Sequence, residues 1–321
     1  MNEESRHQLA PASPTVPGQL IDAHVHLFTY GLFQEYVKAH PDANPVFRQA
    51  VKDRRFGRQQ DLLPDMTPEQ TAHWYVERLK AAGVAKALLV SVVPDSQWTR
   101  EFVTATKGHI HALAYIDPRT PDAAELIERE MAFGFRGAKL LPVNNSYRLS
   151  DPVCRPFLEK AASLRASMIV HYGVTVDPAG DLRYADPIDL SPVARDYPEI
   201  TWVIAHFGAG WLDSVLRLAY QCENICVDSS GTNNWLDYHI PPMSLADVFR
   251  QCLVSLGPER VLFGTDSNTV TPYREWILHT QRRILEEIGL SEHDLDAVMR
   301  GNAVRIFCLC LLYTSPSPRD A

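Results

Sequence analysis

The sequence predicts a closed (β/α)8 barrel, a single domain with a long insertion after its first strand. The chain has 321 residues, of which 45% are apolar and 22% charged, so it can bury one large core or two modest ones. Eight short apolar, β-branched runs alternate with helical patterns. Near-continuous apolar strands separated by helices are typical of a parallel sheet covered on both faces, and eight such units in about 250 to 290 residues favour a barrel. A doubly wound open sheet is the alternative, weakened because no Gly-x-Gly-x-x-Gly follows the first strand.

The predicted strands are short, apolar and rich in Val and Ile. In chain order they cover residues 20–25, 87–93, 110–116, 137–141, 168–171, 202–206, 225–228 and 261–265.

Helix end signals lie between most of these strands. Thr67, Pro68 and Gln70 supply an N-cap, a proline at the first helical position and a capping-box partner, and Gly83 ends this helix. Three further helices are expected, from Thr120 to Gly134, from Ser291 onward, and over residues 295–307.

The connection between the first two strands, residues 27–86, is about twice the usual length for such a unit. It holds aromatic and basic residues, namely Phe28, Tyr30, Phe33, Tyr36, Arg54, Arg55 and Arg58. An insertion after a barrel strand emerges at the carboxyl-terminal face, where barrel enzymes hold their active sites. We therefore expect a lid or a substrate wall.

Composition excludes several classes of partner. A net charge of −8 and a pI near 5.8 provide no broad basic field for a phosphate backbone. No window approaches the roughly 18 apolar residues of a membrane span. Six cysteines in this length are no disulfide framework, and we expect inert thiols. These features predict a cytoplasmic protein that acts on a small molecule, with a homodimer left open.

Both ends of the chain differ in composition from the barrel. Residues 1–18 are polar and proline-rich without an apolar core, which predicts a flexible segment ahead of a domain over 19–308. The run from Cys310 to Asp320 resembles one reading frame of a sequencing adapter, so 309–321 is expected to be a non-native tail. A native flexible tail is the alternative.

Histidines at strand ends carry the functional argument. In the first strand Asp22, His24 and His26 alternate with apolar residues, so all three are expected to face the barrel lumen. Two imidazoles one strand repeat apart can hold one cation. A second His-x-His, His109 and His111, begins its strand and so lies at the opposite, stability-related face; we expect it to be structural.

Three other strands end in a residue able to join His24 and His26. His171 ends the fifth strand, His206 the sixth and Asp266 the eighth. Each alone is typical of a core histidine or a capping aspartate, but all of them at the carboxyl ends of one barrel are hard to explain by packing. Imidazoles with one carboxylate suit one divalent transition metal, zinc first, with Mn, Fe or Co as alternatives.

The chain resembles the amidohydrolase superfamily of metal-dependent TIM barrels, closest to its amidohydrolase-related branch of carboxylic-acid hydrolases and aminocarboxymuconate-semialdehyde-type decarboxylases. The matching segments are residues 21–26, 134–142, 169–173, 204–208, 261–266 and 301–307. The sequence departs from many relatives after Asp266, where Ser267 and Asn268 stand in place of a Tyr-Pro pair; this puts the substrate in doubt rather than the metal site.

The resemblance implies a role for each strand-end residue. His24, His26, His171 and Asp266 would be the metal ligands, and His206 would hold or deprotonate the attacking water, with Asp266 accepting a proton in turn. Lys139 could be carbamylated to bridge two metals, but a solvated, ion-paired or substrate-bound lysine is preferred. Side chains after the strands could bind a ring or an acyl group, namely Tyr172, Phe207, Trp211, Asn233, Asn234 and Trp235.

Three functions remain open at this point. The first is a metal-dependent hydrolase that cleaves a C–N or C–O bond of an amide, lactone or ester by metal-activated water. The second is a metal-dependent, non-oxidative decarboxylase of an aromatic or unsaturated acid, which an arginine in the pocket would favour. Arg54, Arg55, Arg58 and Arg148 leave that choice open. The third, a non-catalytic barrel, predicts the loss of a ligand residue, and none is missing.

Overall fold

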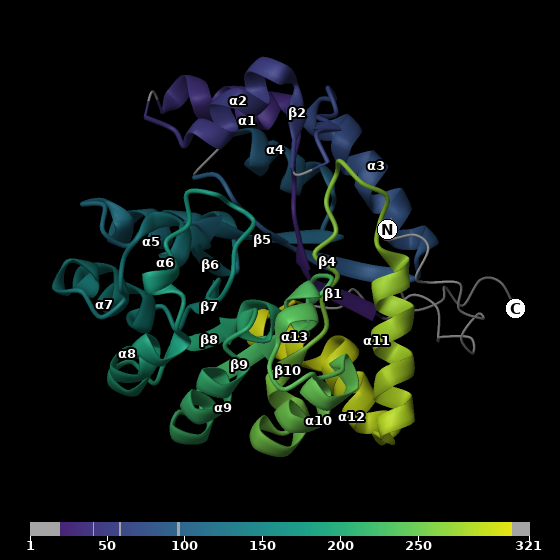
Figure 1. Cartoon of the computed structure of the whole chain (residues 1–321). Helices are drawn as coiled ribbons and strands as arrows, with labels where there is room; N and C mark the ends of the chain where they lie inside the picture. Colours follow the sequence, from purple (N-terminus) through teal and green to yellow (C-terminus); the bar gives the residue numbers. More distant parts are fainter. Residues whose placement is uncertain (1–19, 41, 58, 95–96, 310–321) are drawn as a thin grey trace, which may run out of the picture.

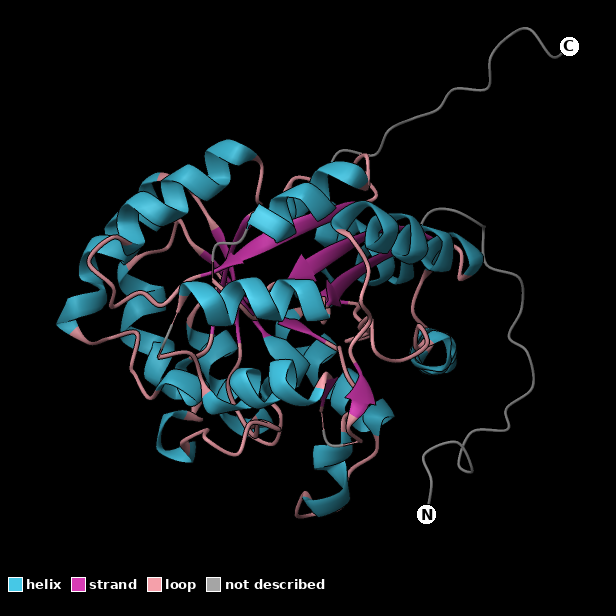
Figure 2. Cartoon of the chain, turned by 90° about the horizontal axis from the view of Figure 1, so that it is seen from above, coloured by secondary structure: helices cyan, strands magenta, loops and turns pink. Residues whose placement is uncertain are grey.

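A computed structural model describes residues 20–309, except for residues 41, 58, 95 and 96. The predictions for the segments 1–18 and 310–321 lie outside the described residues. Within them, helices surround a ring of parallel strands, as the two cartoon views show (Figures 1 and 2).

The eight parallel strands are hydrogen-bonded in the order β1-β4-β5-β6-β7-β8-β9-β10. Backbone contacts between the first strand and the segment after the last one close the ring: Ala23 N donates to Phe263 O at 3.0 Å, and Val25 bridges Ser267 in parallel. The predicted barrel is therefore confirmed, and the open sheet is excluded. The strands are β1 (Leu20–Val25), β4 (Val84–Val90), β5 (Ile110–Tyr115), β6 (Gly137–Leu140), β7 (Ser167–Val170), β8 (Thr201–Ile204), β9 (Ile225–Asp228) and β10 (Val261–Leu262).

Helices of the barrel follow the predicted end signals. The Thr67 side chain accepts from Gln70 N and the Gln70 side chain accepts from Thr67 N, which is the expected capping box of α3. The helix predicted from Thr120 begins later, because Thr120 donates its hydroxyl to Asp117 O in a preceding turn. The helices are α3 (Pro68–Ala81), α4 (Gln97–Ala105), α5 (Ala123–Phe133), α6 (Pro142–Asn145), α7 (Arg155–Ser163), α8 (Ser191–Asp196), α9 (Leu212–Gln221), α10 (Leu245–Leu256), α11 (Glu275–Ile288), α12 (Glu292–Asp296) and α13 (Asn302–Phe307), with a π-helical turn over Ala297–Gly301.

Several strands end earlier than the apolar runs suggested. His171 and His206 lie beyond the last residues of β7 and β8, and Asp266 lies four residues beyond β10. His206 and Asp266 have φ angles of 56° and 57°, and this left-handed conformation cannot continue a strand. Likewise β4 spans Val84–Val90 rather than 87–93. His171, His206 and Asp266 therefore lie on the loops just past the strands.

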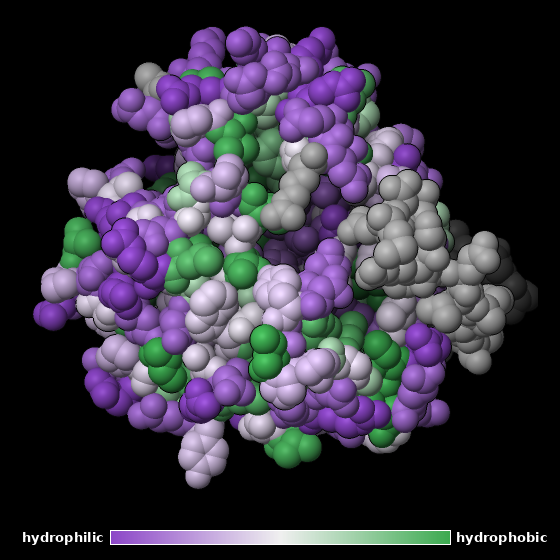
Figure 3. All heavy atoms as spheres, in the orientation of Figure 1, coloured by the Kyte–Doolittle hydropathy of each residue, from purple (hydrophilic) through white to green (hydrophobic). Residues whose placement is uncertain are grey.

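The long connection after β1 forms a lobe at the carboxyl-terminal face, as predicted (Figure 1). It consists of α1 (Tyr30–Ala39), α2 (Pro45–Asp53) and a hairpin of β2 (Arg55–Phe56) and β3 (Asp61–Leu62). Phe33, Phe47 and Phe56 pack together with ring centroids 5.0 to 5.8 Å apart, and Phe28 stacks on His26 at 5.5 Å. The outer surface of the lobe is mostly hydrophilic in the space-filling view (Figure 3). The lobe thus has an aromatic core of its own and places Phe28 against His26.

Two apolar cores hold the barrel together. The larger lies between the outward strand faces and the helices, and the smaller fills the lumen with side chains such as Ile21, Leu88 and Leu113. Phe307 and Leu309 belong to the lumen core, so α13 closes the amino-terminal mouth of the barrel. Among the described residues no helix has the length and apolar character that crossing a membrane requires.

Candidate metal centre

Three predicted ligands lie together at the carboxyl-terminal face. His24 lies on β1, His26 directly follows it, and Asp266 follows β10. One ligand atom from each lies within 4.8 Å of those of the other two. His24 is fully buried, whereas the Asp266 side chain keeps 26% of its surface exposed. The cluster is therefore buried at His24 and accessible to solvent at Asp266.

Hydrogen bonds at the far nitrogens orient both imidazoles. His24 Nδ1 lies 2.9 Å from Asp228 Oδ2, and His26 Nδ1 donates to Val90 O at 2.7 Å. Both Nε2 atoms consequently remain for the centre: that of His26 lies 3.0 Å from Asp266 Oδ1 and that of His24 4.0 Å from the same oxygen. His24 Nε2 is buried and has no hydrogen-bond partner. A neutral imidazole held by a carboxylate, with its other nitrogen unsatisfied, fits a metal ligand.

The local electrostatics favour a neutral His24 beside a charged Asp266. Burial lowers the pKa of His24 to about 4, against the opposing effect of Asp228. Burial disfavours the charged form of Asp266, but the hydrogen bond and charge of His26, with His206 and Arg274, outweigh it and hold the Asp266 pKa well below its usual range. This is the protonation that metal binding requires, because protons compete with a cation for the same atoms.

His206 lies next to His24, and His171 lies next to His206. The His206 ring lies 5.0 Å from that of His24 and 5.2 Å from that of His171, measured between centroids. His206 Nδ1 donates to Ser230 O at 3.0 Å, which leaves its Nε2 as an acceptor. His171 uses Nε2 toward Val174 O at 3.0 Å, which leaves Nδ1. His171 is not one of the three residues whose ligand atoms are within 4.8 Å of one another.

Asp22 does not share the face of His24, so that expectation was wrong. A β-bulge changes the register of β1 against β4 between Asp22 and Val25. Asp22 consequently accepts from Thr265 and from Tyr273 Oη at 2.8 Å, outside the lumen, and burial raises its pKa to about 6. It ties β1 to the end of β10 rather than facing a ligand.

Asp228 at the end of β9 is a candidate site residue that was not predicted from the sequence. It is fully buried, contacts His24 Nδ1, and accepts from the backbone nitrogens of His206 and Ser230 at 3.0 and 3.1 Å. Burial opposes its charge, yet the interactions with His24, His206 and Ser230 lower its pKa. An aspartate ending an otherwise apolar strand was the available signal.

Two cationic side chains, Lys139 and Arg274, interact electrostatically with Asp266. Lys139 on β6 pairs in register with Ile169 of the lumen core; it is 1% exposed, and its Nζ has no hydrogen-bond partner. Burial lowers its pKa to about 8, although Asp228 and Asp266 act in the opposite direction. Arg274, which was not predicted, lies with Nη1 3.3 Å from Asp266 Oδ2. Of the arginines considered from the sequence, Arg54 pairs with Asp65 and Arg148 with Asp189, and Arg55 Nη1 donates to Gln60 O at 2.6 Å. Arg58 lies outside the described residues.

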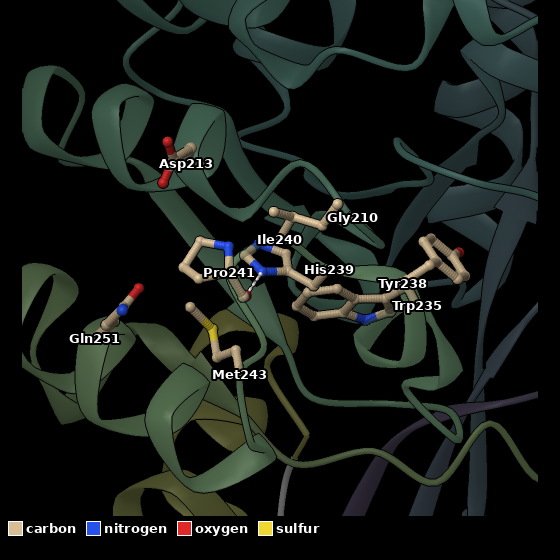
Figure 4. Close-up of a pocket in the computed structure, with 9 residues that line it drawn as sticks. All are labelled: Gly210, Asp213, Trp235, Tyr238, His239, Ile240, Pro241, Met243 and Gln251. Carbon is tan, nitrogen blue, oxygen red and sulfur yellow. Dashed lines mark hydrogen bonds between the residues drawn. The ribbon is translucent and has the colours of Figure 1, made fainter.

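The residues predicted to bind substrate do not form one common pocket, and they differ in burial. Tyr172 is buried in the outer core with its hydroxyl unsatisfied, Trp211 is half-buried at the start of α9, and Asn234 is exposed. Trp235 lines a cavity of about 460 Å³ between α9, α10 and the loop after β9 (Figure 4). The cavity residues are Gly210, Asp213, Trp235, Tyr238, His239, Ile240, Pro241, Met243 and Gln251. None of the metal-centre residues lines it.

Comparison with known proteins agrees with this architecture. The model of the family described as Amidohydrolase matches residues 21–309. No curated protein sequence matches the chain.

Solved structures share the fold at low identity. A candidate 2-pyrone-4,6-dicarboxylic acid hydrolase from Pseudomonas putida has a TM-score of 0.64 and 18% identity over 92% of this chain and 99% of its own. The 5-carboxyvanillate decarboxylase of Sphingomonas paucimobilis has a TM-score of 0.66 and 16% identity, over 91% and 100%. That of Novosphingobium aromaticivorans, complexed with manganese and a nitrobenzoic acid, has a TM-score of 0.60 and 14% identity, over 90% and 96%. With the family model covering nearly all described residues, the chain belongs to the amidohydrolase family of enzymes.

Proposed function

We propose that the chain is a metal-dependent hydrolase. It cleaves a C–N or C–O bond, as in an amide, a lactone or an ester, and its substrate is a carboxylated ring compound or a small organic acid. The observation that carries this proposal is the cluster of His24, His26 and Asp266, in which a buried His24 nitrogen lacks a hydrogen-bond partner.

We infer that His24, His26, His171 and Asp266 hold one divalent ion, with zinc first and manganese, iron or cobalt as alternatives. The set of imidazoles and one carboxylate suits these metals. A bound ion would lower the pKa of a water ligand and polarise a substrate carbonyl. The manganese complex of the 14% identical decarboxylase supports a transition metal without choosing among them.

His206 is the proposed proton acceptor. Its Nδ1 is engaged by Ser230 O, so Nε2 is free to take the proton of an attacking water. The proton then passes to the leaving nitrogen or oxygen as the bond to the carbonyl carbon breaks. Asp266, which contacts both His26 and Arg274, is the second proton acceptor.

Lys139 and Arg274 support a carboxylated substrate. A buried amine without a partner stabilises an anion that enters the lumen, and a guanidinium at the rim can form a bidentate pair with a carboxylate. The names of two structural neighbours, a dicarboxylic acid hydrolase and a carboxyvanillate decarboxylase, describe carboxylated rings. Tyr172, Trp211, Asn234 and Trp235 stay predictions as substrate contacts.

Arg274 also favours the second function, a non-oxidative decarboxylase of an aromatic or unsaturated acid. Such an enzyme needs a cationic group to orient the carboxylate that is lost, and Arg274 lies 3.3 Å from a predicted metal ligand. The cytoplasmic location and the homodimer stay predictions from the sequence.

One experiment separates the two functions. Purified protein is assayed for metal by elemental analysis and then supplied with carboxylated lactones and amides in one panel and carboxylated phenols in another. The hydrolase proposal expects about one equivalent of metal, ring-opened or cleaved acids, and no carbon dioxide. Release of carbon dioxide alone identifies the decarboxylase. Well-folded protein that binds no metal at all contradicts both.

A further inference from the structure

The Asp22 carboxylate, which is fully buried on β1, accepts four hydrogen bonds. Its Oδ1 accepts from His24 N at 3.1 Å and from Thr265 N at 3.0 Å. Its Oδ2 accepts from the Thr265 hydroxyl and from Tyr273 Oη at 2.8 Å. Three of the four donors therefore belong to the segment that connects β10 to α11.

Each residue of this segment that Asp22 holds directly precedes a residue of the candidate metal centre. Thr265 precedes Asp266, and Tyr273 precedes Arg274. The side chains of Asp266 and Arg274 contact each other, with Nη1 3.3 Å from Oδ2. One buried carboxylate thus holds the chain immediately before both members of this ion pair.

Further hydrogen bonds carry the restraint through the segment. The Ser267 hydroxyl lies 2.7 Å from Thr265 Oγ1 and accepts from Arg274 N at 3.0 Å. On the other side, Asp266 N donates to His24 O at 2.9 Å. Asp266 has a φ angle of 57°, and a residue other than glycine keeps this left-handed conformation where its surroundings hold it there.

Closing the barrel does not account for Asp22. Backbone bonds already join β1 to the segment after β10, as between Ala23 N and Phe263 O at 3.0 Å. Burying a carboxylate is costly unless its oxygens are hydrogen-bonded, and backbone donors supply only half of the bonds here. The two hydroxyl bonds act on the segment that carries Asp266 and Arg274.

We propose that Asp22 is a positioning residue, which fixes the Asp266 carboxylate and the Arg274 guanidinium relative to each other by holding the chain just before each of them. Asp22 itself touches no reactant. Its consequence for the reaction rests on the proposed function, in which Asp266 is a metal ligand and Arg274 binds the substrate carboxylate. Asp22 then aligns the substrate with the ion.

Hydrogen exchange of the metal-free protein, followed by NMR, tests the positioning. The backbone amides of Asp266 and Arg274 bond to acceptors other than Asp22, so their exchange reports how firmly the segment is held. Asp22→Ala is expected to speed exchange at both amides about tenfold or more, because bonds to a charged acceptor are lost. Tyr273→Phe removes only one of these bonds and should speed exchange at Arg274 more than at Asp266.

Zn²⁺ affinity, measured by competition with a chromophoric chelator, tests the consequence. Asp22→Ala should weaken binding about 10- to 100-fold, as the loss of a group that orients a ligand does. Asp22→Asn should restore part of the affinity, since its amide oxygen can still accept from both backbone nitrogens. The matched control is Glu130→Gln, at a buried carboxylate of α5 that pairs with Arg100. It should lower stability and leave both the Zn²⁺ affinity and the two amides unchanged.

Wild-type exchange at Asp266 and Arg274 in both Asp22→Ala and Tyr273→Phe overturns the proposal, and so does an equal acceleration in Glu130→Gln. If Asp22→Ala does not fold, Tyr273→Phe decides alone. A Zn²⁺ affinity that no Asp22 variant alters also counts against the positioning of Asp266. Wild-type protein that binds no Zn²⁺ contradicts the proposed function instead, and the exchange rates then still decide the role of Asp22.

Discussion

At the residue scale, two residues of the candidate metal centre are held in unusual backbone conformations just past the strands. His206 and Asp266 have positive φ angles, and Gly264 brings the segment after β10 against β1, since a Cβ there would lie 2.9 Å from the Cβ atoms of His24 and Ser230. The sequence predicted the histidines and Asp266 because their residue types at strand ends are informative. Asp228 and Arg274 were missed because their roles depend on which distant side chains they contact.

Substitutions of His206 and of Asp228 should affect different properties, turnover in the first case and metal affinity in the second. We expect His206→Asn to retain metal and to lower kcat about 10²- to 10⁴-fold, as the loss of a general base does. Asp228→Asn should instead weaken metal binding about 10- to 100-fold, because it removes the carboxylate that orients His24. Competition with a chromophoric chelator measures the affinity, and Asp237→Asn, at an exposed position, is the control. Normal turnover in His206→Asn would refute its proton-transfer role.

At the element scale, local signals predicted the helices better than the strand faces. The Thr67 capping box and the Ser291 N-cap are formed as their residue types indicate. The strict alternation expected for β1 fails, because the bulge between Asp22 and Val25 inserts one residue and turns Asp22 out of the lumen. A bulge depends on the register with a neighbouring strand, which a single strand's pattern does not contain.

Two capping boxes allow a matched test of helix stability. Thr67→Ala in α3 and Ser244→Ala in α10 each remove the side-chain acceptor of a first-turn amide, Gln70 N or Asp247 N, whereas the bonds from the backbone nitrogens of Thr67 and Ser244 to the Gln70 and Asp247 side chains remain. Each substitution should lower the free energy of unfolding by about 1 kcal/mol. Urea denaturation measures this, with Thr104→Ala in α4 as a control whose hydroxyl bonds only within its helix. Loss of stability in the control alone would contradict the capping argument.

At the scale of the whole molecule, the lumen is layered. The candidate metal centre occupies the carboxyl-terminal end, an apolar layer fills the middle, and Lys86 and His111 lie near the amino-terminal mouth that α13 closes. The alternation of apolar strands and helices was sufficient to predict the barrel, since eight such units have few other ways to bury both faces of their sheet. The contact between Lys86 and His111 was not predicted, because it depends on how two neighbouring strands pair rather than on the pattern of either strand.

The histidines buried in the lumen predict that the free energy of unfolding of the metal-free protein depends strongly on pH. Burial holds the pKa of His24 and His111 at about 4, and that of His171 well below its usual value. Between pH 6.5 and 4 the unfolded chain therefore binds protons that the folded imidazoles do not, so the free energy of unfolding falls as the pH falls. Asp22, whose folded pKa is about 6 against an ordinary 3.8, offsets part of this loss below about pH 6. Urea unfolding at pH 7, 6 and 5, in buffers free of phosphate and carboxylates, should show the decline, and His111→Gln should make it shallower without altering the metal centre. A stability that stays constant or rises on acidification would show that these imidazoles are protonated in the folded protein.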